Sequence, residues 1–187
     1  WQLPKPLLLT SVINGGITHA KNILKHTASL VDRASEATFE NQRQYLTFLM
    51  QGEEYGVDIL SVQEIRGWGN VSPIPNAPAH VSGGINLRGA IVPVIDLRVL
   101  FQLSDSSYDE NTVVIVLKVS TEKVNRIMGI VVDAVSDVFA LSPADKQSPP
   151  SVNQSVSHDF IEGLTEVKGK MVILLDSERL LHLENHG

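Results

Sequence analysis

The chain has 187 residues, a formal net charge of −6 from 15 basic and 21 acidic residues, and no cysteine. This length fits one domain, or two small domains that share an interface. The acidic balance argues against nucleic-acid binding, which needs a basic surface, and the absence of cysteine excludes thiol nucleophiles, disulfides and cysteine-based zinc sites. No apolar run approaches the roughly 18–20 residues of a membrane-spanning helix. The composition therefore predicts a soluble intracellular protein.

Residues 1–43 form an N-terminal extension that contains few strand-like runs. Apolar residues recur there at three- and four-residue steps between Ile17 and Ala34, which is a helical spacing. The pattern fits one amphipathic helix from about Thr18 to Thr38. It fits equally a loose tail that samples helix, and both alternatives stay open, as does whether all of this extension is native sequence.

Residues 44–187 are predicted to be all-β with short helices. Short β-branched runs bounded by Gly, Pro, Asn or Asp are typical of strands, and the chain contains seven of them: Gln44–Gln51, Tyr55–Ile59, Gly84–Leu87, Ile91–Ile95, Thr112–Val119, Ile127–Val135 and Lys170–Leu175. The segment Gly52-Glu53-Glu54 between the first two runs predicts a hairpin loop.

Two of these runs are expected to lie inside a sheet. Val113–Leu117 and Met171–Leu175 are apolar at every position, so both faces of each strand need cover. Asp96 and Asp176 each follow a strand-like run, where an aspartate can accept hydrogen bonds from the free amides of a helix. Short helices are therefore predicted after both aspartates.

An internal repeat is the most informative feature of this region. Gly56–Ile65 aligns without gaps with Gly129–Val138, and Gly83–Asp96 aligns in the same way with Gly163–Asp176. Glycine recurs where the backbone needs a positive φ or a close approach, so the shared glycines indicate shared turns. The repeat predicts two related units of about five short strands each, and sheets of that size hide their edges best by closing into barrels.

The chain shows no pattern typical of catalysis or metal binding. No pair of its six histidines has the spacing and the glutamate of a helical zinc site, and no nucleophile elbow or glycine-rich phosphate loop is present. His19 and His26 could share a helix face but lack a carboxylate ligand. These observations argue against an enzyme and predict neither a metal nor a cofactor.

A binding surface is the remaining interpretation. Val62–Arg66 mixes aliphatic and charged residues, and Arg88 lies between Leu87 and a Gly89 turn, where its guanidinium could pair with a carboxylate of a partner. In the alternative interpretation, Val62 and Leu87 belong to the core while Glu64 and Arg88 are simply solvated. Composition does not distinguish these two interpretations.

Four motifs resemble the CheW-like family of bacterial chemotaxis coupling proteins: Glu54–Gly67, Asn86–Arg98, Asn111–Val116 and Gly129–Val138. The resemblance extends from about Gln44 to Leu181. It implies two five-stranded SH3-like β-barrels, as intertwined subdomains of one CheW-like module over residues 44–187. It also implies a non-enzymatic adaptor without cofactors, which couples transmembrane chemoreceptors to the histidine kinase CheA. Such a protein is cytoplasmic and associated with membrane-bound receptor arrays.

The resemblance further implies partners and contact residues. The expected partners are the cytoplasmic tip of a chemoreceptor, the regulatory domain of CheA and other CheW-like domains in rings, without nucleic acid or membrane insertion. The residues matching receptor-contact positions, in a groove between the barrels, are Val62, Gly83, Leu87 and Arg88, and those matching kinase-contact positions are Glu64, Gln147 and Val152. Two alternatives are a regulatory CheW-like domain of a larger chemotaxis kinase or scaffold protein, and a small-ligand-binding β-barrel.

Overall fold

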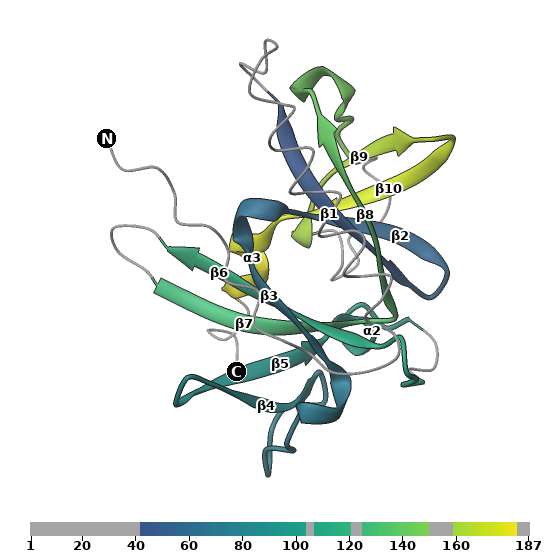
Figure 1. The fold of residues 1–187 in the computed structure, drawn as a ribbon. Helices are drawn as coiled ribbons and strands as arrows, with labels where there is room; N and C mark the ends of the chain where they lie inside the picture. Colours follow the sequence, from purple (N-terminus) through teal and green to yellow (C-terminus); the bar gives the residue numbers. More distant parts are fainter. Residues whose placement is uncertain (1–41, 104–106, 121–124, 150–158, 183–187) are drawn as a thin grey trace.

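The computed structural model describes residues 42–103, 107–120, 125–149 and 159–182 (Figure 1). The helix predicted near Thr18–Thr38 lies outside these ranges, as does Val152. Within them the chain forms ten strands: β1 (Arg43–Met50), β2 (Glu53–Asp58), β3 (Val62–Gly67), β4 (Val81–Leu87), β5 (Ala90–Asp96), β6 (Val113–Ser120), β7 (Asn125–Val132), β8 (Ala134–Leu141), β9 (Ile161–Val167) and β10 (Lys170–Leu175).

Short helical turns join several strands. The α-helices α2 (Leu97–Leu100) and α3 (Ser177–Leu181) follow β5 and β10, and the 3₁₀ turns are η2 (Ile59–Ser61), η3 (Trp68–Asn70) and η4 (Pro143–Asp145). The predicted helix caps are confirmed, because the side chain of Asp96 accepts from the amide of Arg98, and that of Asp176 accepts from the amides of Glu178 and Arg179. No helix in the described ranges is long and apolar enough to span a membrane.

The strands form two curled sheets of five, in the orders β8-β1-β2-β10-β9 and β3-β6-β7-β5-β4. The predicted all-β architecture with two five-stranded units is therefore confirmed (Figure 1). Each sheet is built from both halves of the chain. The β1–β2 hairpin lies between β8 and β10, and the β6–β7 hairpin lies between β3 and β5, so the two sequence repeats exchange their first hairpins.

The register of the exchanged hairpins explains the repeated glycines. In the parallel pairings, Gly56 of β2 lies opposite Leu174 of β10, and Gly129 of β7 lies opposite Val94 of β5. A Cβ atom on Gly56 would come within 3.2 Å of the Leu174 side chain, and one on Gly129 within 2.6 Å of the Val114 side chain. A side chain at position 129 would therefore force its neighbours to shift, and one at position 56 would need Leu174 to give by a few tenths of an ångström, because side chains already lie close to the missing Cβ atoms.

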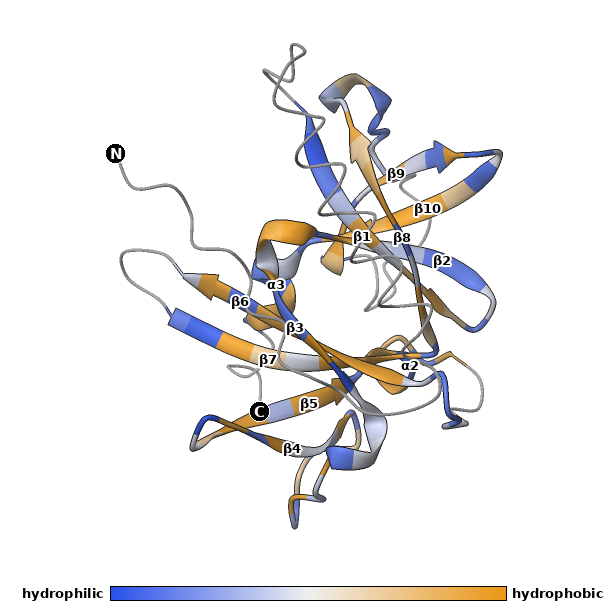
Figure 2. Ribbon diagram, in the orientation of Figure 1, coloured by the Kyte–Doolittle hydropathy of each residue, from blue (hydrophilic) through white to orange (hydrophobic). Residues whose placement is uncertain are grey.

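Three apolar clusters make up the core. One lies inside each curled sheet, and the largest combines residues of both sheets and so lies between them (Figure 2). In β6, Val114 and Val116 pack inside their own sheet, whereas Ile115 and Leu117 pack in the cluster between the sheets. The expectation that Val113–Leu117 forms an interior strand covered on both faces is confirmed.

In each sheet, an isolated β-bridge connects one outer strand to the segment that follows the other outer strand. In the β3–β7 sheet, Ser72 pairs with Gly84 of β4 through two hydrogen bonds of 2.9 and 2.8 Å. In the other sheet, Gln147, which follows β8, pairs with Leu164 of β9 through two bonds of 2.8 Å. The two bridges have equivalent places in the two sheets and bring the edges of each sheet together, as in a barrel.

Two details of the strands differ from the sequence prediction. The first hairpin turns at Gln51-Gly52, with φ of 53° and 79°, because a two-residue turn of this type needs two positive φ angles. The predicted loop Gly52-Glu53-Glu54 is therefore wrong by one residue at its start, and both glutamates belong to β2. In addition, β3, β8 and β9 were not among the predicted strands.

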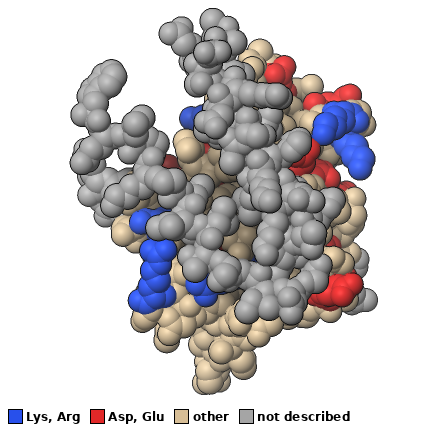
Figure 3. All heavy atoms as spheres, in the orientation of Figure 1, with Lys and Arg blue, Asp and Glu red and all other residues tan. Residues whose placement is uncertain are grey.

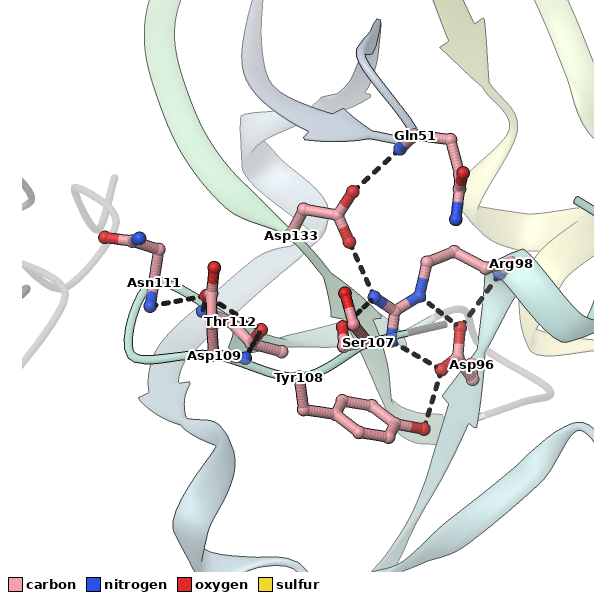
Figure 4. A network of polar contacts seen from close by, with 9 residues as sticks. All are labelled: Gln51, Asp96, Arg98, Ser107, Tyr108, Asp109, Asn111, Thr112 and Asp133. Carbon is pink, nitrogen blue, oxygen red and sulfur yellow. Dashed lines mark hydrogen bonds and ion pairs between the residues drawn. The ribbon is translucent and has the colours of Figure 1, made fainter. Parts of the chain in front are cut away.

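A buried ion-pair network joins the two sheets (Figure 4). The fully buried guanidinium of Arg98 donates to both carboxylate oxygens of Asp96, at 2.9 and 2.7 Å, and to Asp133 Oδ1 at 2.6 Å. Burial by itself would lower the pKa of Arg98, but the hydrogen bonds and charges of Asp96 and Asp133 outweigh burial and raise it. Arg98 is therefore a permanently charged residue inside the protein.

Asp133 extends this network to the other sheet. Its Oδ2 accepts from the backbone amide of Gln51 at 2.7 Å, in the β1–β2 turn, and its own amide donates to the carbonyl of Leu49 at 2.9 Å. The Asp96–Arg98–Asp133 network thus fixes the turn of one exchanged hairpin against the end of β5 in the opposite sheet (Figure 4).

We expect the substitution Arg98→Met to lower the free energy of unfolding by about 3–5 kcal/mol, because it leaves the buried carboxylate of Asp96 without a counter-charge. Urea denaturation followed by circular dichroism measures this loss. The matched control is Arg179→Met, since Arg179 pairs with Asp176 at 3.1 Å on the surface of the other half. That change should cost only about 0–1 kcal/mol. Equal losses in the two variants would contradict the account of the network.

We expect Gly83→Ala to lower the free energy of unfolding by about 1–3 kcal/mol or more. Gly83 has a φ of 152°, and a Cβ atom there would lie 2.3 Å from the carbonyl oxygen of Ser72, inside the bridge that joins the sheet edges. The control is Gly67→Ala, because Gly67 has an ordinary φ of −67° and open space around it. Amide hydrogen exchange at Ser72 and Gly84 should accelerate only in Gly83→Ala, and unchanged protection there would refute the role assigned to Gly83.

Candidate partner-binding surface

Three of the seven predicted contact residues, Glu64, Gly83 and Arg88, lie on β3, on β4 or in the turn after β4, where the two edges of one sheet approach each other. We call this region the β3–β4 junction and define it by Glu64, Arg66, Ser72, Gly83, Gly84, Asn86 and Arg88. Its strands are the edge strands of their sheet, and Asn86 and Arg88 are its exposed residues on and after β4. The junction therefore brings Gly83 and Arg88, which were predicted for one partner, close to Glu64, which was predicted for another.

A β-bulge sets the direction of the side chains in β3. Val62 pairs with Leu117 and Glu64 with Val116, so Gln63 is an extra residue without a partner in the ladder. The extra residue lets Val62 and Ile65 both pack against the core between the sheets, although they are three positions apart. Glu64 and Arg66 consequently lie on the opposite face of β3, away from the core between the sheets.

Arg66 connects the two edges of the junction. Its Nε donates to the carboxylate of Glu64 on the same strand, and its NH1 donates to the carbonyl oxygen of Asn86 on β4 at 3.0 Å. Both side chains are largely shielded from solvent, with 28% of Arg66 and 16% of Glu64 exposed. The charge of Glu64 is therefore already balanced within the chain.

Arg88 is held by its backbone rather than by its side chain. It occupies a left-handed conformation with φ of 52°, followed by Gly89 with φ of 91°. The side chain of Asn86 accepts from the amide of Gly89 at 2.8 Å and fixes this turn. Arg88 is exposed, and in the described ranges its guanidinium forms neither a hydrogen bond nor an ion pair. A cation presented in this way suits recognition of a carboxylate.

An apolar surface lies beside this cation. Ile91 of β5 is 78% exposed and Ile74 is 41% exposed, and both reach to within 3.4 Å of the Cβ position of Gly84. No Asp, Glu, Lys or Arg occurs between Arg66 and Arg88 in the sequence. The lowermost part of the surface in Figure 3, around the loop before β4, is accordingly uncharged. Exposed aliphatic groups next to an arginine are typical of protein–protein interfaces.

The side chains of Val62 and Leu87 belong to the core. Val62 is 8% exposed in the cluster between the sheets, and Leu87 is 5% exposed in the cluster inside the β3–β7 sheet. The burial of Val62 and Leu87 agrees with the interpretation that places both side chains in the core. Any effect of Val62 or Leu87 on a partner must therefore pass through the strand backbone they hold in place.

Gln147 lies on the other sheet, where its backbone pairs with Leu164. The structure does not bring it together with Glu64, although both were predicted to contact the same partner. Val152 lies outside the described residues.

Sequence reasoning missed Ser72, Gly84 and Asn86 within the junction, and Ile74 and Trp68 beside it. Trp68 follows β3 and stacks on Tyr108 with ring centroids 4.1 Å apart, while the Tyr108 hydroxyl donates to Asp96 Oδ2 at 2.9 Å (Figure 4). The buried network thus also supports the segment that leads out of β3. The charge-free stretch around Ile74 was the available signal in the sequence, since surface loops are normally polar.

The described residues contain no group of three or more His, Asp or Glu side chains placed to hold a metal ion. What the junction offers is an exposed cation, an apolar surface and a balanced ion pair, which is a set of groups suited to binding another protein.

Comparison with known proteins agrees with this picture. The family model of the CheW-like domain matches residues 44–185. Chemotaxis protein CheW of Klebsiella aerogenes is 46% identical over 142 residues, which is 76% of this chain and 83% of that protein. Chemotaxis protein CheW of Rhizobium meliloti is 34% identical, again over 142 residues, covering 76% of this chain and 89% of that protein.

A solved structure supports the same assignment. The crystal structure of the scaffolding protein TtCheW from Thermoanaerobacter tengcongensis is similar with a TM-score of 0.64 and 30% sequence identity, over 72% of this chain and 88% of that one. The family expected from the four sequence motifs is confirmed by the domain match and by these relatives. The chain therefore belongs to the CheW-like domain family.

Proposed function

We propose that this protein is a non-enzymatic chemotaxis adaptor that couples transmembrane chemoreceptors to the histidine kinase CheA. The observation that carries the proposal is the CheW-like domain match over residues 44–185, together with the 46% identity to a chemotaxis protein CheW. The partners would be the cytoplasmic tip of a receptor, the regulatory domain of CheA and other CheW-like domains. The protein would act in the cytoplasm, at membrane-bound receptor arrays.

The geometry is compatible with two binding surfaces. The β3–β4 junction presents Arg88 beside exposed Ile91, and we assign it chiefly to the receptor, with Gly83 shaping its backbone. Val62 and Leu87 would contribute from the core beneath it. Glu64, Gln147 and Val152 are assigned to the kinase, and Gln147 lies on the opposite sheet. Because the β3–β4 junction and Gln147 lie on different sheets, an adaptor of this shape could contact two proteins at once.

The physical role is to bring two partners together in one assembly. Each surface needs only modest affinity, because binding to one partner raises the effective concentration of the other. Control of the kinase by the receptor further requires that the adaptor favour one arrangement over another, by about 1–3 kcal/mol for ordinary allosteric coupling.

We expect Arg88→Glu to weaken binding to a receptor-tip fragment about fivefold or more, because it replaces the exposed cation of the junction with a charge of the opposite sign. Co-sedimentation of the protein with vesicles that carry the receptor-tip fragment measures this loss. Lys118→Glu is the matched control, since Lys118 is exposed on β6 and the change in net charge is the same. A loss of similar size in both variants would indicate a general charge effect and would refute the assignment of Arg88.

The function itself is tested by reconstitution. Receptor, CheA and this protein are combined in vesicles, and autophosphorylation of CheA is measured with and without the protein. We expect CheA activity to depend on the presence of the protein. We also expect it to fall when ligand switches the receptor to its kinase-inhibiting state. Kinase activity that is indifferent to the protein would refute the adaptor function.

A further inference from the structure

The segment that carries Gln147 closes its sheet in the same way as the segment that carries Ser72 closes the other sheet. Gln147 and Leu164 exchange two backbone hydrogen bonds of 2.8 Å, as Ser72 and Gly84 do at 2.9 and 2.8 Å. The amide and the carbonyl group of Gln147 are therefore used inside the chain, and its exposed side chain is what remains for a partner. The place of that side chain depends on how firmly the bridge to Leu164 holds.

The residue before each bridge differs between the two sheets. In one sheet it is Val71, whose Cγ1 lies 2.9 Å from the position of a Cβ atom on Gly83. In the other sheet it is Lys146, whose Cγ and Cδ lie 2.6 and 2.9 Å from the corresponding position on Gly163. The stem of the lysine therefore packs where the valine packs, and the ammonium group extends beyond it. One bridge thus has an apolar neighbour and the other a charged one.

The ammonium group of Lys146 pairs with a carboxylate of β9. Its Nζ lies 2.6 Å from Oε1 of Glu162, at a place where the other sheet has the uncharged Ser82. The hydroxyl of Tyr45 donates to Oε2 of the same carboxylate at 3.3 Å, and Tyr45 is buried in the cluster inside this sheet. The carboxylate therefore has a fixed partner in the core as well as one near the surface.

This ion pair is partly shielded from solvent. Lys146 is 34% exposed and Glu162 is 21% exposed. Arg43, which is 67% exposed, approaches the same carboxylate to only 3.8 Å. Lys146 is therefore the main counter-charge of Glu162.

The residues on either side of Lys146 are attached to β9 as well. The carbonyl oxygen of Asp145 accepts from the hydroxyl of Thr165 at 3.0 Å, and Gln147 forms its bridge. Three consecutive residues thus hold this segment against one strand. The ion pair is the charged attachment among the three, and it is the one that responds to the salt concentration.

We propose that Lys146 is a positioning residue for the kinase: its ion pair with Glu162 keeps the bridge at Gln147 closed and so holds the Gln147 side chain in place for the regulatory domain of CheA. The inference rests on the proposed function, in which Gln147 contacts the kinase. In this account Lys146 itself does not touch the kinase. The closure of this sheet depends on charge, whereas the equivalent closure at Ser72 does not.

The substitution Lys146→Met tests this role in the full chain, because methionine keeps an unbranched stem over Gly163 and removes the charge. Hydrogen exchange of the Gln147 and Leu164 amides should accelerate about two- to fivefold, as expected for the loss of a partly exposed ion pair. Exchange at Ser72 should stay the same. Binding to the regulatory domain of CheA, measured by titration, should weaken by a similar factor.

Two further variants complete the design. Lys170→Met removes the same charge from an exposed position on β10 of the same sheet and should change neither measurement. The double variant Lys146→Glu with Glu162→Lys restores the ion pair with reversed signs. It should return exchange and binding to within about twofold of the unchanged protein.

Salt gives a second readout that needs no partner. Raising NaCl from about 0.1 M to about 1 M should accelerate exchange at Gln147 in the unchanged protein, because salt screens a partly exposed ion pair. Exchange at Gln147 in Lys146→Met should no longer respond to salt. Exchange at Ser72 should not respond in either protein, because its bridge adjoins Val71 instead of a lysine.

The two measurements together decide the proposal. Unchanged exchange in Lys146→Met would overturn it, and so would weaker binding without faster exchange, since Lys146 would then contact the kinase itself. Faster exchange with full binding would also overturn it, because the bridge would not matter to the partner. If the unchanged protein does not bind the regulatory domain, the proposed function fails at the kinase, whereas faster exchange at Gln147 would still assign Lys146 to the closure of the sheet.

Discussion

The fold depends on the fit of two exchanged hairpins into sheets formed by the other half of the chain. The β1–β2 hairpin pairs antiparallel with β8 on one side and parallel with β10 on the other, and β6–β7 pairs in the same way with β3 and β5. Without its hairpin each sheet would lose the strands that join its two parts. Gly56 and Gly129 permit the parallel pairings, because a Cβ atom at either position would press against a neighbouring side chain.

The exchange makes the contact between the sheets an essential part of the molecule. The largest apolar cluster lies there, and so does the buried network in which Arg98 binds Asp96 and Asp133. A buried ion pair adds little net stability compared with an apolar packing, but it penalises any arrangement that separates its members. The network therefore fixes how the sheets sit relative to each other, and the edge strands can then present side chains at defined positions.

The sequence predicted the all-β class, the two units and both helix caps, because strand-like runs, repeated glycines and aspartates after strands are local signals. The strands β3 and β8 escaped prediction for a common physical reason. Each contains a bulge, at Gln63 in β3 and at Ser136–Asp137 in β8, which breaks the alternation of apolar and polar residues. The repeat did not show the exchange of hairpins, since it reveals which strands are alike but not which of them pair; only the family resemblance implied intertwined subdomains.

The candidate site was predictable in part. Gly83, Glu64 and Arg88, which the resemblance assigned to two different partners, all belong to the β3–β4 junction, and their roles in binding stay predictions. The pairing of Glu64 with Arg66 and the bond from Arg66 to Asn86 could not be foreseen, because they depend on the approach of two strand edges that are twenty residues apart in the chain. The same approach exposes Ile91 beside Gly84, where the sequence alone shows only another strand residue.

The central claim is that one small β-protein binds two partners through separate surfaces of a rigid pair of sheets. Sedimentation velocity of this protein with a receptor-tip fragment and the regulatory domain of CheA tests the claim most directly. The account predicts a ternary species that contains all three proteins and sediments faster than either binary complex. Displacement of one partner by the other, with only binary complexes at saturation, would contradict it.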